Sequence, residues 1–116
     1  MSQTFILQQH NADRAGPHQD LYLEEDTHFR SYAIPKGVSP MVGTKRLAIK
    51  VADHSPKEAS FEGTIAEGYG KGTKEVIDEG SYLEPVPNTL LFFGSHLQGR
   101  YMLKHLEGNK YLIWKA

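Results

Sequence analysis

The chain has 116 residues, of which 39% are hydrophobic and 23% are charged, and its net charge is −1 with the histidines neutral. This composition excludes a disordered chain, and the small charge argues against a protein that coats nucleic acid along its length. The apolar runs are too short to cross a membrane, the first residues lack a signal-peptide pattern, and cysteines are absent. We therefore expect a single domain over residues 1–116 that lies in the cytoplasm and makes no membrane contact.

Short alternating segments, separated by glycine and proline, indicate a chain made mainly of β-strands. In chain order the predicted elements are strands over 4–10, 18–25, 29–34 and 45–52, one helical turn over 55–59, a glycine-rich loop over 63–72, strands over 73–78, 80–84 and 89–93, and a closing hairpin over 97–105 and 110–115. Eight or nine short strands in one small domain must close into a barrel or pack as two sheets. We favour a mainly β fold, a small closed barrel of about eight strands with little helix.

Alternation also predicts which side chains share a face of each strand. Phe5 and Leu7 are expected to share one face of their strand, and Leu21 and Leu23 one face of theirs, while Leu47, Ile49 and Val51 are expected to face the core. Those expected on the opposite faces include His10, His18, Asp20, Tyr22, Arg46 and Ala48. The polar members of this second set are the candidates for chemistry.

The strongest candidate group is His10, His18 and Asp20, which we predict to be metal ligands. His18 and Asp20 are two residues apart on one strand, and a seven-residue loop over 11–17 lets His10 return beside them. Imidazole and carboxylate groups suit several divalent metals, and three protein ligands leave open positions for water and substrate. On spacing alone, a solvated polar face of a strand explains the same three residues equally well.

A second candidate pair is Arg46 and His54, which lie eight residues apart on one predicted strand. An even separation on a continuous strand puts both side chains on one face, where arginine can hold two phosphate oxygens and histidine can add a hydrogen bond. Such pairs are also common on exposed faces. The glycine-rich stretch over 67–72 is not a phosphate-binding P-loop, because the Lys-Ser or Lys-Thr ending is missing.

Six segments in the right order resemble the 3′-phosphoesterase module of bacterial DNA ligase D and its free-standing relatives. They are 5–10 (Phe-Ile-Leu-Gln-Gln-His), 18–24 (His-Gln-Asp-Leu-Tyr-Leu-Glu), 31–37 (Ser-Tyr-Ala-Ile-Pro-Lys-Gly), 45–54, 61–73 with its Tyr69-Gly70-Lys71-Gly72, and the closing hairpin over 97–103 and 111–115. The family has similar motifs at these places, such as His-Tyr-Asp-Phe-Arg-Leu-Glu and Ser-Trp-Ala-Val-Pro-Lys-Gly. The resemblance runs over nearly the whole chain.

The resemblance implies a compact β-barrel and an enzyme, a divalent-metal-dependent phosphodiesterase and phosphomonoesterase. His10, His18 and Asp20 would hold Mn²⁺, with Zn²⁺ or Co²⁺ as alternatives, and Arg46 and His54 would be catalytic and bind the scissile phosphate. The family removes a 3′-terminal ribonucleotide and then the 3′-phosphate in DNA repair by end joining. The partners implied are nucleic-acid 3′ ends, together with separate ligase and polymerase proteins.

The sequence departs from the family pattern at several positions. His10 and His18 are eight residues apart, two more than in the family. Tyr22 stands where the family has an arginine that contacts phosphate, and Glu58 stands where it has a tyrosine. We hypothesise that Arg14, in the loop after His10, supplies the missing positive charge, and that the Tyr22 hydroxyl donates a hydrogen bond to phosphate. Unchanged activity in Arg14→Ala would rule out the first idea.

Two other functions are compatible with the sequence. One is a non-catalytic accessory module of the same fold, which binds a metal or a nucleic-acid end without turnover. The other is a cupin-like metalloenzyme that acts on a small metabolite, because His18, Asp20 and Glu24 share a strand face. That class would need a further histidine near the metal, for which His54 and His96 are the candidates.

Overall fold

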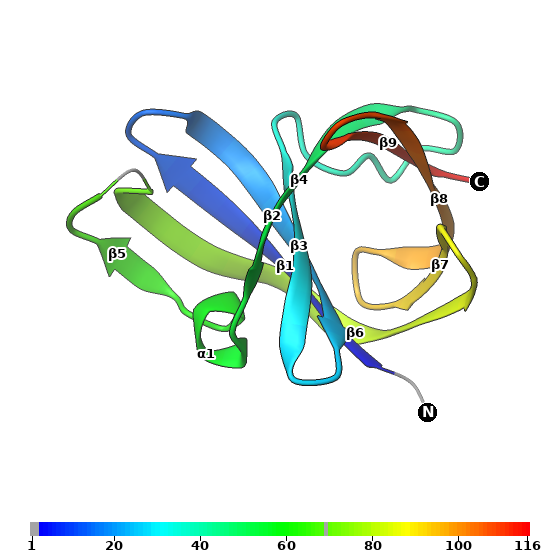
Figure 1. Ribbon diagram of the computed structural model, residues 1–116, viewed down its shortest axis with the longest axis horizontal. Helices are drawn as coiled ribbons and strands as arrows, with labels where there is room; N and C mark the ends of the chain where they lie inside the picture. Colours follow the sequence, from blue (N-terminus) through cyan, green and yellow to red (C-terminus); the bar gives the residue numbers. More distant parts are fainter. Residues whose placement is uncertain (1–2, 69) are drawn as a thin grey trace.

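The computed structural model describes residues 3–68 and 70–116 of the chain (Figure 1). Within these two ranges the elements are β1 (Gln3–Ala12), β2 (Gly16–Glu25), β3 (His28–Ile34), β4 (Arg46–His54), α1 (Pro56–Ala59), β5 (Gly63–Ile65), β6 (Gly72–Val86), β7 (Thr89–Phe93), β8 (Gln98–Glu107) and β9 (Lys110–Lys115). Tyr69, part of one family-like motif, lies outside the described residues. None of the helices described is long and apolar enough to cross a membrane.

The strands form a closed antiparallel barrel, which confirms the predicted fold class. Their order is β1-β2-β3-β4-β9-β8-β7-β6, and pairing between β1 and β6 closes the ring of eight. The long strand β6 combines the two predicted strands over 73–78 and 80–84, and its first residues also pair with the short β5, which the sequence did not predict. Figure 1 shows the β1–β2 tip, β5 and the start of β6 extending to one side of the barrel.

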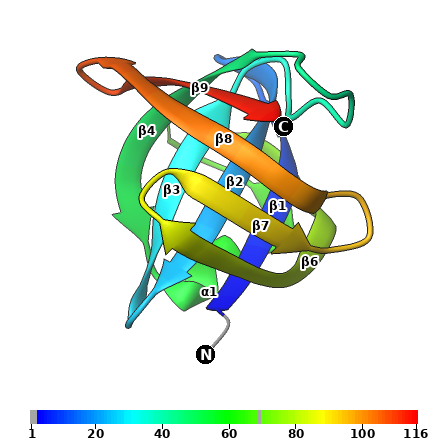
Figure 2. The same ribbon diagram turned by 90° about the vertical axis from the view of Figure 1, so that its right-hand side faces the viewer.

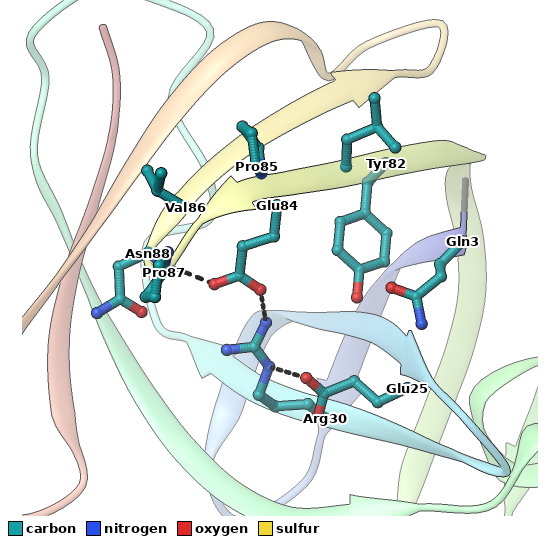
Figure 3. A pocket seen from close by; sticks show the side chains of 10 residues that line it. Gln3, Glu25, Arg30, Tyr82, Glu84, Pro85, Val86, Pro87 and Asn88 are labelled. Carbon is teal, nitrogen blue, oxygen red and sulfur yellow. Dashed lines mark hydrogen bonds and ion pairs between the residues drawn. The ribbon is translucent and has the colours of Figure 1, made fainter. Parts of the chain in front are cut away.

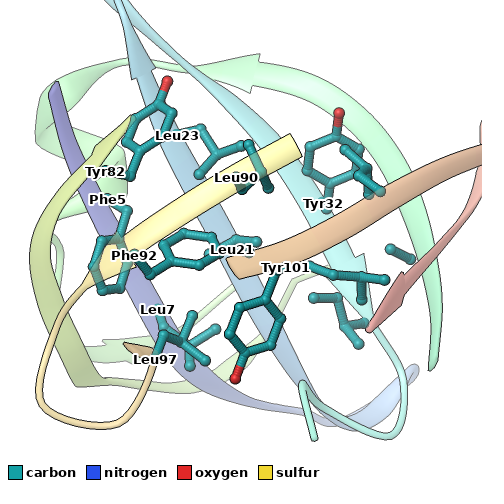
Figure 4. Packing of buried hydrophobic residues seen from close by; sticks show 14 residues of the cluster. Phe5, Leu7, Leu21, Leu23, Tyr32, Tyr82, Leu90, Phe92, Leu97 and Tyr101 are labelled. Carbon is teal, nitrogen blue, oxygen red and sulfur yellow. The ribbon is translucent and has the colours of Figure 1, made fainter. Parts of the chain in front are cut away.

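The main core fills the barrel with the apolar faces of its strands (Figure 4). Its buried members include Phe5 and Leu7, which share a face of β1 as predicted, and Leu21 and Leu23, which share a face of β2 as predicted. Phe92 of β7 contacts both Phe5 and Tyr101 edge to face, with ring centroids 4.9 Å and 5.4 Å apart. Burial of this apolar surface is the main favourable term in folding.

A second apolar cluster lies on the outer face of the barrel. Ile6, Tyr22 and Phe29 come from the outward sides of β1, β2 and β3, and Ala59 of α1 covers them. Ser55 starts this helix with a capping box, in which its side chain accepts from the Glu58 backbone N–H and its own N–H donates to the Glu58 carboxylate. The polar residues His10, His18 and Asp20 of β1 and β2 lie beside this outer apolar cluster.

The prediction for the core face of β4 is wrong, because the outer face of this strand carries the three residues expected inside: Leu47, Ile49 and Val51. Ala48 points inward instead and is fully buried. The barrel interior there already holds the aromatic rings of Tyr32 and Tyr111, whose centroids are 5.5 Å apart. Only a small side chain fits beside these rings; Ile49 and Val51 line an outer cavity instead, and Leu47 is exposed.

Candidate metal centre

Three neighbouring strands place His18, His10 and Lys74 in one row. His10 of β1 lies opposite His18 of β2 and also opposite Lys74 of β6. The seven-residue loop expected after His10 is shorter, because β1 continues to Ala12 and β2 begins at Gly16. The hairpin therefore aligns the two histidines directly, and Asp20 follows His18 on the same face two residues later.

The three predicted ligands come together on the outer face of the barrel. Ligand atoms from His10, His18 and Asp20 all lie within 4.8 Å of one another. His10 Nδ1 is 3.2 Å from one Asp20 carboxylate oxygen, and His18 Nε2 is 3.2 Å from the other. Two imidazoles and one carboxylate form a donor set suited to divalent transition metals.

The second nitrogen of each histidine ring has a partner that favours metal binding. His10 Nε2 donates to the Gly70 carbonyl at 2.8 Å, and His18 Nδ1 donates to the Gly16 carbonyl at 3.1 Å. Histidine ligands of metals usually donate the non-ligating N–H to such an oxygen, which fixes the tautomer and the ring orientation. His10 Nδ1 and His18 Nε2 are thereby left facing Asp20, as a metal site requires.

The electrostatics of the site keep Asp20 ionised. Burial alone would raise the pKa of this carboxyl, but the hydrogen bond from His18 and the positive charges of His18, Lys74 and His10 outweigh burial, so the pKa lies below its usual value. The hydrogen bond to Asp20 in turn raises the pKa of His18 above its ordinary value, against the effect of burial. The site is thus a mutually stabilised set of charges.

A cavity of about 430 Å³ opens beside these ligands, and we call it the site cavity. Its walls include the metal-ligand candidates, the aliphatic Ile49 and Val51, and the ring of His54. Polar groups therefore converge at one end of a mostly apolar hollow, an arrangement typical of small-molecule and active sites.

His54 reaches the site cavity because β4 contains a β-bulge. Phe29 pairs with His54 but Ser31 pairs with Val51, so one extra residue lies on β4 between these pairs. The extra residue reverses the alternation, and His54 shares the face of Ile49 and Val51. The even spacing from Arg46 therefore does not put the two side chains on one face.

The tautomer of His54 follows from its bond to Ser31. The Ser31 hydroxyl donates to the Phe29 carbonyl at 3.0 Å, so its oxygen must accept from His54 Nδ1–H, 2.9 Å away. This leaves Nε2 as the unprotonated nitrogen of the neutral ring. His54 can take up or return a proton there, or donate to an anion when it is protonated.

Neither arginine of the predicted phosphate site lines the site cavity. The Arg46 guanidinium donates to the backbone carbonyls of Lys36 and Gly37 after β3. Arg14 is exposed in the turn between β1 and β2. The structure thus brings together His10, His18, Asp20 and His54, whereas these two arginines lie outside the cavity walls.

Lys74 is a site residue that sequence reasoning missed. Its ammonium is 3.5 Å from Asp20 Oδ2 and donates to the Tyr22 hydroxyl at 2.6 Å, and its side chain is only 8% exposed. The Tyr22 hydroxyl also lies 3.5 Å from Asp20 Oδ2, so it is turned toward the metal-ligand group. The sequence predicts a strand over 73–78, but only the pairing of β6 with β1 shows that Lys74 lies beside His10.

A neighbouring hollow of about 430 Å³, which we call the side cavity, shares His10, His54, Gly70 and Lys74 with the site cavity. Its other walls include Phe61 and Glu58. The Glu58 carboxylate accepts the Ser55 N–H in the capping box, and this bond chiefly lowers the pKa of Glu58. Its negative charge is therefore engaged in starting α1.

A larger hollow of about 700 Å³ lies elsewhere, beside β6 and the β2–β3 hairpin (Figure 3). The dominant polar group there is Arg30, whose guanidinium lies 2.7 Å from Glu84 and 3.5 Å from Glu25. Glu84 also accepts the Asn88 N–H at 2.7 Å. These charges pair with one another and connect β3 to the β6–β7 turn, although Arg30 Nε makes no hydrogen bond with any residue that the structure describes, so this hollow is a structural ion-pair site.

Comparisons with known proteins agree with this geometry. A family model described as DNA Ligase D 3′-phosphoesterase domain matches residues 8–111. The multifunctional non-homologous end joining DNA repair protein LigD of Mycobacterium tuberculosis is 36% identical over 94% of this chain. The corresponding proteins of Mycolicibacterium smegmatis and Pseudomonas aeruginosa are 33% and 37% identical over 93% and 85% of it. The chain spans only 15%, 16% and 13% of the length of these three relatives.

Proposed function

Because the chain belongs to the DNA ligase D 3′-phosphoesterase domain family, we propose that it is a divalent-metal-dependent phosphoesterase that trims nucleic-acid 3′ ends. Its substrates would be strands that carry a terminal ribonucleotide, a 3′-phosphate or both. The observation that carries the proposal is the group of His10, His18 and Asp20, with ligand atoms within 4.8 Å and outer nitrogens held by backbone carbonyls. Mn²⁺ is the proposed metal.

In the proposed mechanism, three residues bind the metal and His54 acts on the phosphate. His10, His18 and Asp20 would hold the cation, which when bound supplies Lewis-acid polarisation of a phosphate oxygen. His54, which also lines the site cavity, would present Nε2 to the reacting phosphate and exchange a proton with it or donate to a developing negative charge. The Tyr22 ring packs edge to face on His54, with centroids 5.2 Å apart, and so fixes its position.

The roles of Arg46, Arg14 and Tyr22 toward phosphate stay predictions. Arg46 holds the turn after β3 through the Lys36 and Gly37 carbonyls, and contact with a phosphate requires it to leave those bonds. Arg14 is exposed in the β1–β2 turn, next to Ala15, which lines the site cavity, and this neighbourhood is what supports a role for it toward phosphate. The Tyr22 hydroxyl faces Asp20 and Lys74, which supports a positioning role for Tyr22.

The biological setting that we propose is DNA end joining. The relatives are named as end-joining proteins, and a trimmed 3′-hydroxyl is the end that a DNA ligase requires. The proposed partners are therefore primer-strand 3′ ends and, downstream, polymerase and ligase activities.

The test is a gel assay on the purified protein with a 5′-labelled primer–template that ends in one 3′ ribonucleotide. With Mn²⁺, we expect a shorter strand that carries a 3′-phosphate or a 3′-hydroxyl, and no change with a chelator. His10→Ala should abolish the shift, whereas His105→Ala, an exposed histidine bonded only to the Gly108 carbonyl, should not. Folded, metal-loaded protein that binds the primer end without cleaving it would instead establish a non-catalytic binding module.

A further inference from the structure

Lys74 is a buried cation placed between two cavities. Its side chain is 8% exposed, yet it lines both the site cavity and the side cavity. Among the described residues, it is the only lysine or arginine that lines the site cavity. Burying an ammonium is costly unless it is paired, and here the pairing partners are Asp20 and the Tyr22 hydroxyl.

Lys74 forms its ion pair with the Asp20 carboxylate, which is also a proposed ligand of the metal. Asp20 Oδ2 lies 3.5 Å from the Lys74 ammonium and 3.2 Å from His10 Nδ1. A divalent cation seated among His10, His18 and Asp20 would carry two positive charges within a few ångströms of this ammonium. Like charges at such a distance repel strongly in a partly buried site, so Lys74 and the metal compete for Asp20.

If a metal displaces Lys74 from Asp20, the lysine side chain has two adjoining cavities into which it can move. Lys74 lines both the site cavity and the side cavity, and its Nζ lies 5.2 Å from the centroid of the Tyr22 ring. A cation displaced from a carboxylate in such a hollow gains most from an incoming anion. The phosphate of the proposed substrate would arrive at this point, beside His54.

We propose that Lys74 is the phosphate-binding cation of this site and that metal binding releases it from Asp20 for that purpose. The inference rests on the proposed function for the nature of the substrate. In this proposal the Lys74 ammonium changes its partner. It pairs with Asp20 in the metal-free protein and binds a phosphate oxygen in the metal-loaded protein. Metal and phosphate should therefore bind with positive coupling that passes through Lys74.

The test is calorimetric titration of the purified protein with Mn²⁺ alone and then of the Mn²⁺-loaded protein with inorganic phosphate. Lys74→Met should bind Mn²⁺ about 10-fold more tightly than the wild type and phosphate about 10-fold more weakly, because one variant removes both the competitor and the anion partner. Lys71→Met is the matched control, since Lys71 is 56% exposed and lines neither cavity. It should change neither affinity.

Three results would overturn the inference. Equal Mn²⁺ affinity in the wild type and Lys74→Met would show that Lys74 does not compete with the metal. Unchanged phosphate affinity in Lys74→Met would show that Lys74 is only a structural counter-ion. A wild type that binds no Mn²⁺ would overturn the proposed metal site as well, so the two failures are distinguishable without any turnover measurement. If Lys74→Met does not fold, Lys74→Gln removes the charge and keeps a donor for the Tyr22 hydroxyl, and the same two titrations decide.

Discussion

His10 lies directly opposite His18 in the β1–β2 ladder, and the centroids of the two imidazole rings are 4.7 Å apart. Opposed residues of an antiparallel pair are held at a fixed separation by the ladder on either side of them. The two strands therefore supply a rigid pair of nitrogen donors before any metal binds, and Asp20 adds the oxygen donor from the same face.

This arrangement predicts that Asp20→Asn binds Mn²⁺ at least about 100-fold more weakly than the wild type, because it removes the charged ligand and keeps the shape. Loss of an outer-shell partner alone typically costs 10–100-fold. Titration calorimetry measures the affinity, and the rise in melting temperature with added Mn²⁺ should disappear. Gln9→Ala is the control, since Gln9 bonds only to Asn11 at an exposed place. Retained affinity in Asp20→Asn would remove Asp20 from the ligand set.

The sequence predicted the barrel and the meeting of His10, His18 and Asp20, because both depend on local alternation. Two-residue periodicity separated the two faces of β2, with Leu21 and Leu23 on the face that the structure buries and His18 and Asp20 on the opposite face. The ladder then brought His10 into line. Nothing beyond these two neighbouring strands and their turn was needed for the ligands to meet.

The rest of the site depends on features that local periodicity does not contain. His54 changed face because of a β-bulge in β4, which the sequence does not mark. Lys74 meets His10 only because β6 closes the barrel against β1, a pairing between residues 64 positions apart in the chain. The apolar Ile49 and Val51 look like core residues in a pattern, and only the crowded rings inside the barrel show why they line an outer cavity.

The bond between Ser31 and His54 predicts a measurable tautomer. In Ser31→Ala, the Nδ1 position loses its acceptor, so the neutral ring should redistribute its proton between Nδ1 and Nε2. Nitrogen-15 NMR of the imidazole reports this shift directly, and turnover should fall about 10-fold, part of what a positioned acid–base group contributes. Ser39→Ala, another buried serine whose oxygen accepts only the Met41 N–H, should leave both unchanged. An unaltered His54 tautomer would contradict the assignment.

We expect replacement of Gln8 to weaken the structure most strongly around α1 and the segment that follows it. The Gln8 amide donates to the carbonyls of Ala59 and Phe61, at 2.9 Å and 2.6 Å, and so ties the segment after α1 to β1. Gln8→Leu leaves both carbonyls without this donor and should lower the free energy of unfolding by about 1–3 kcal/mol. Hydrogen exchange should rise most over residues 56–65. Gln9→Leu on the same strand should affect neither quantity, and uniform exchange in both variants would show that Gln8 is not the anchor.

The lowered pKa of Asp78 lets us predict how the free energy of unfolding of the metal-free protein depends on pH. Burial alone would raise the pKa of this carboxyl, but hydrogen bonds from the backbone N–H groups of Leu97, Ser95, His96 and Glu79 outweigh burial, and the pKa lies below its usual value. The carboxylate therefore contributes stability that is fully present above about pH 4, the unfolded pKa, and is lost as the pH falls through the lower folded pKa.

Replacing this carboxylate should remove the pH dependence along with the stability. Asp78→Asn should be less stable than the wild type by about 2 kcal/mol at pH 7, because its amide has one acceptor oxygen for two of these N–H groups and turns an NH2 donor toward the other two. Urea unfolding at a series of pH values should show the two proteins converging below about pH 4. Asp53→Asn, at a side chain that is 46% exposed, should follow the wild-type curve at every pH. A constant gap between Asp78→Asn and the wild type from pH 7 to pH 3 would mean that the ionised carboxylate does not anchor the turn between β7 and β8.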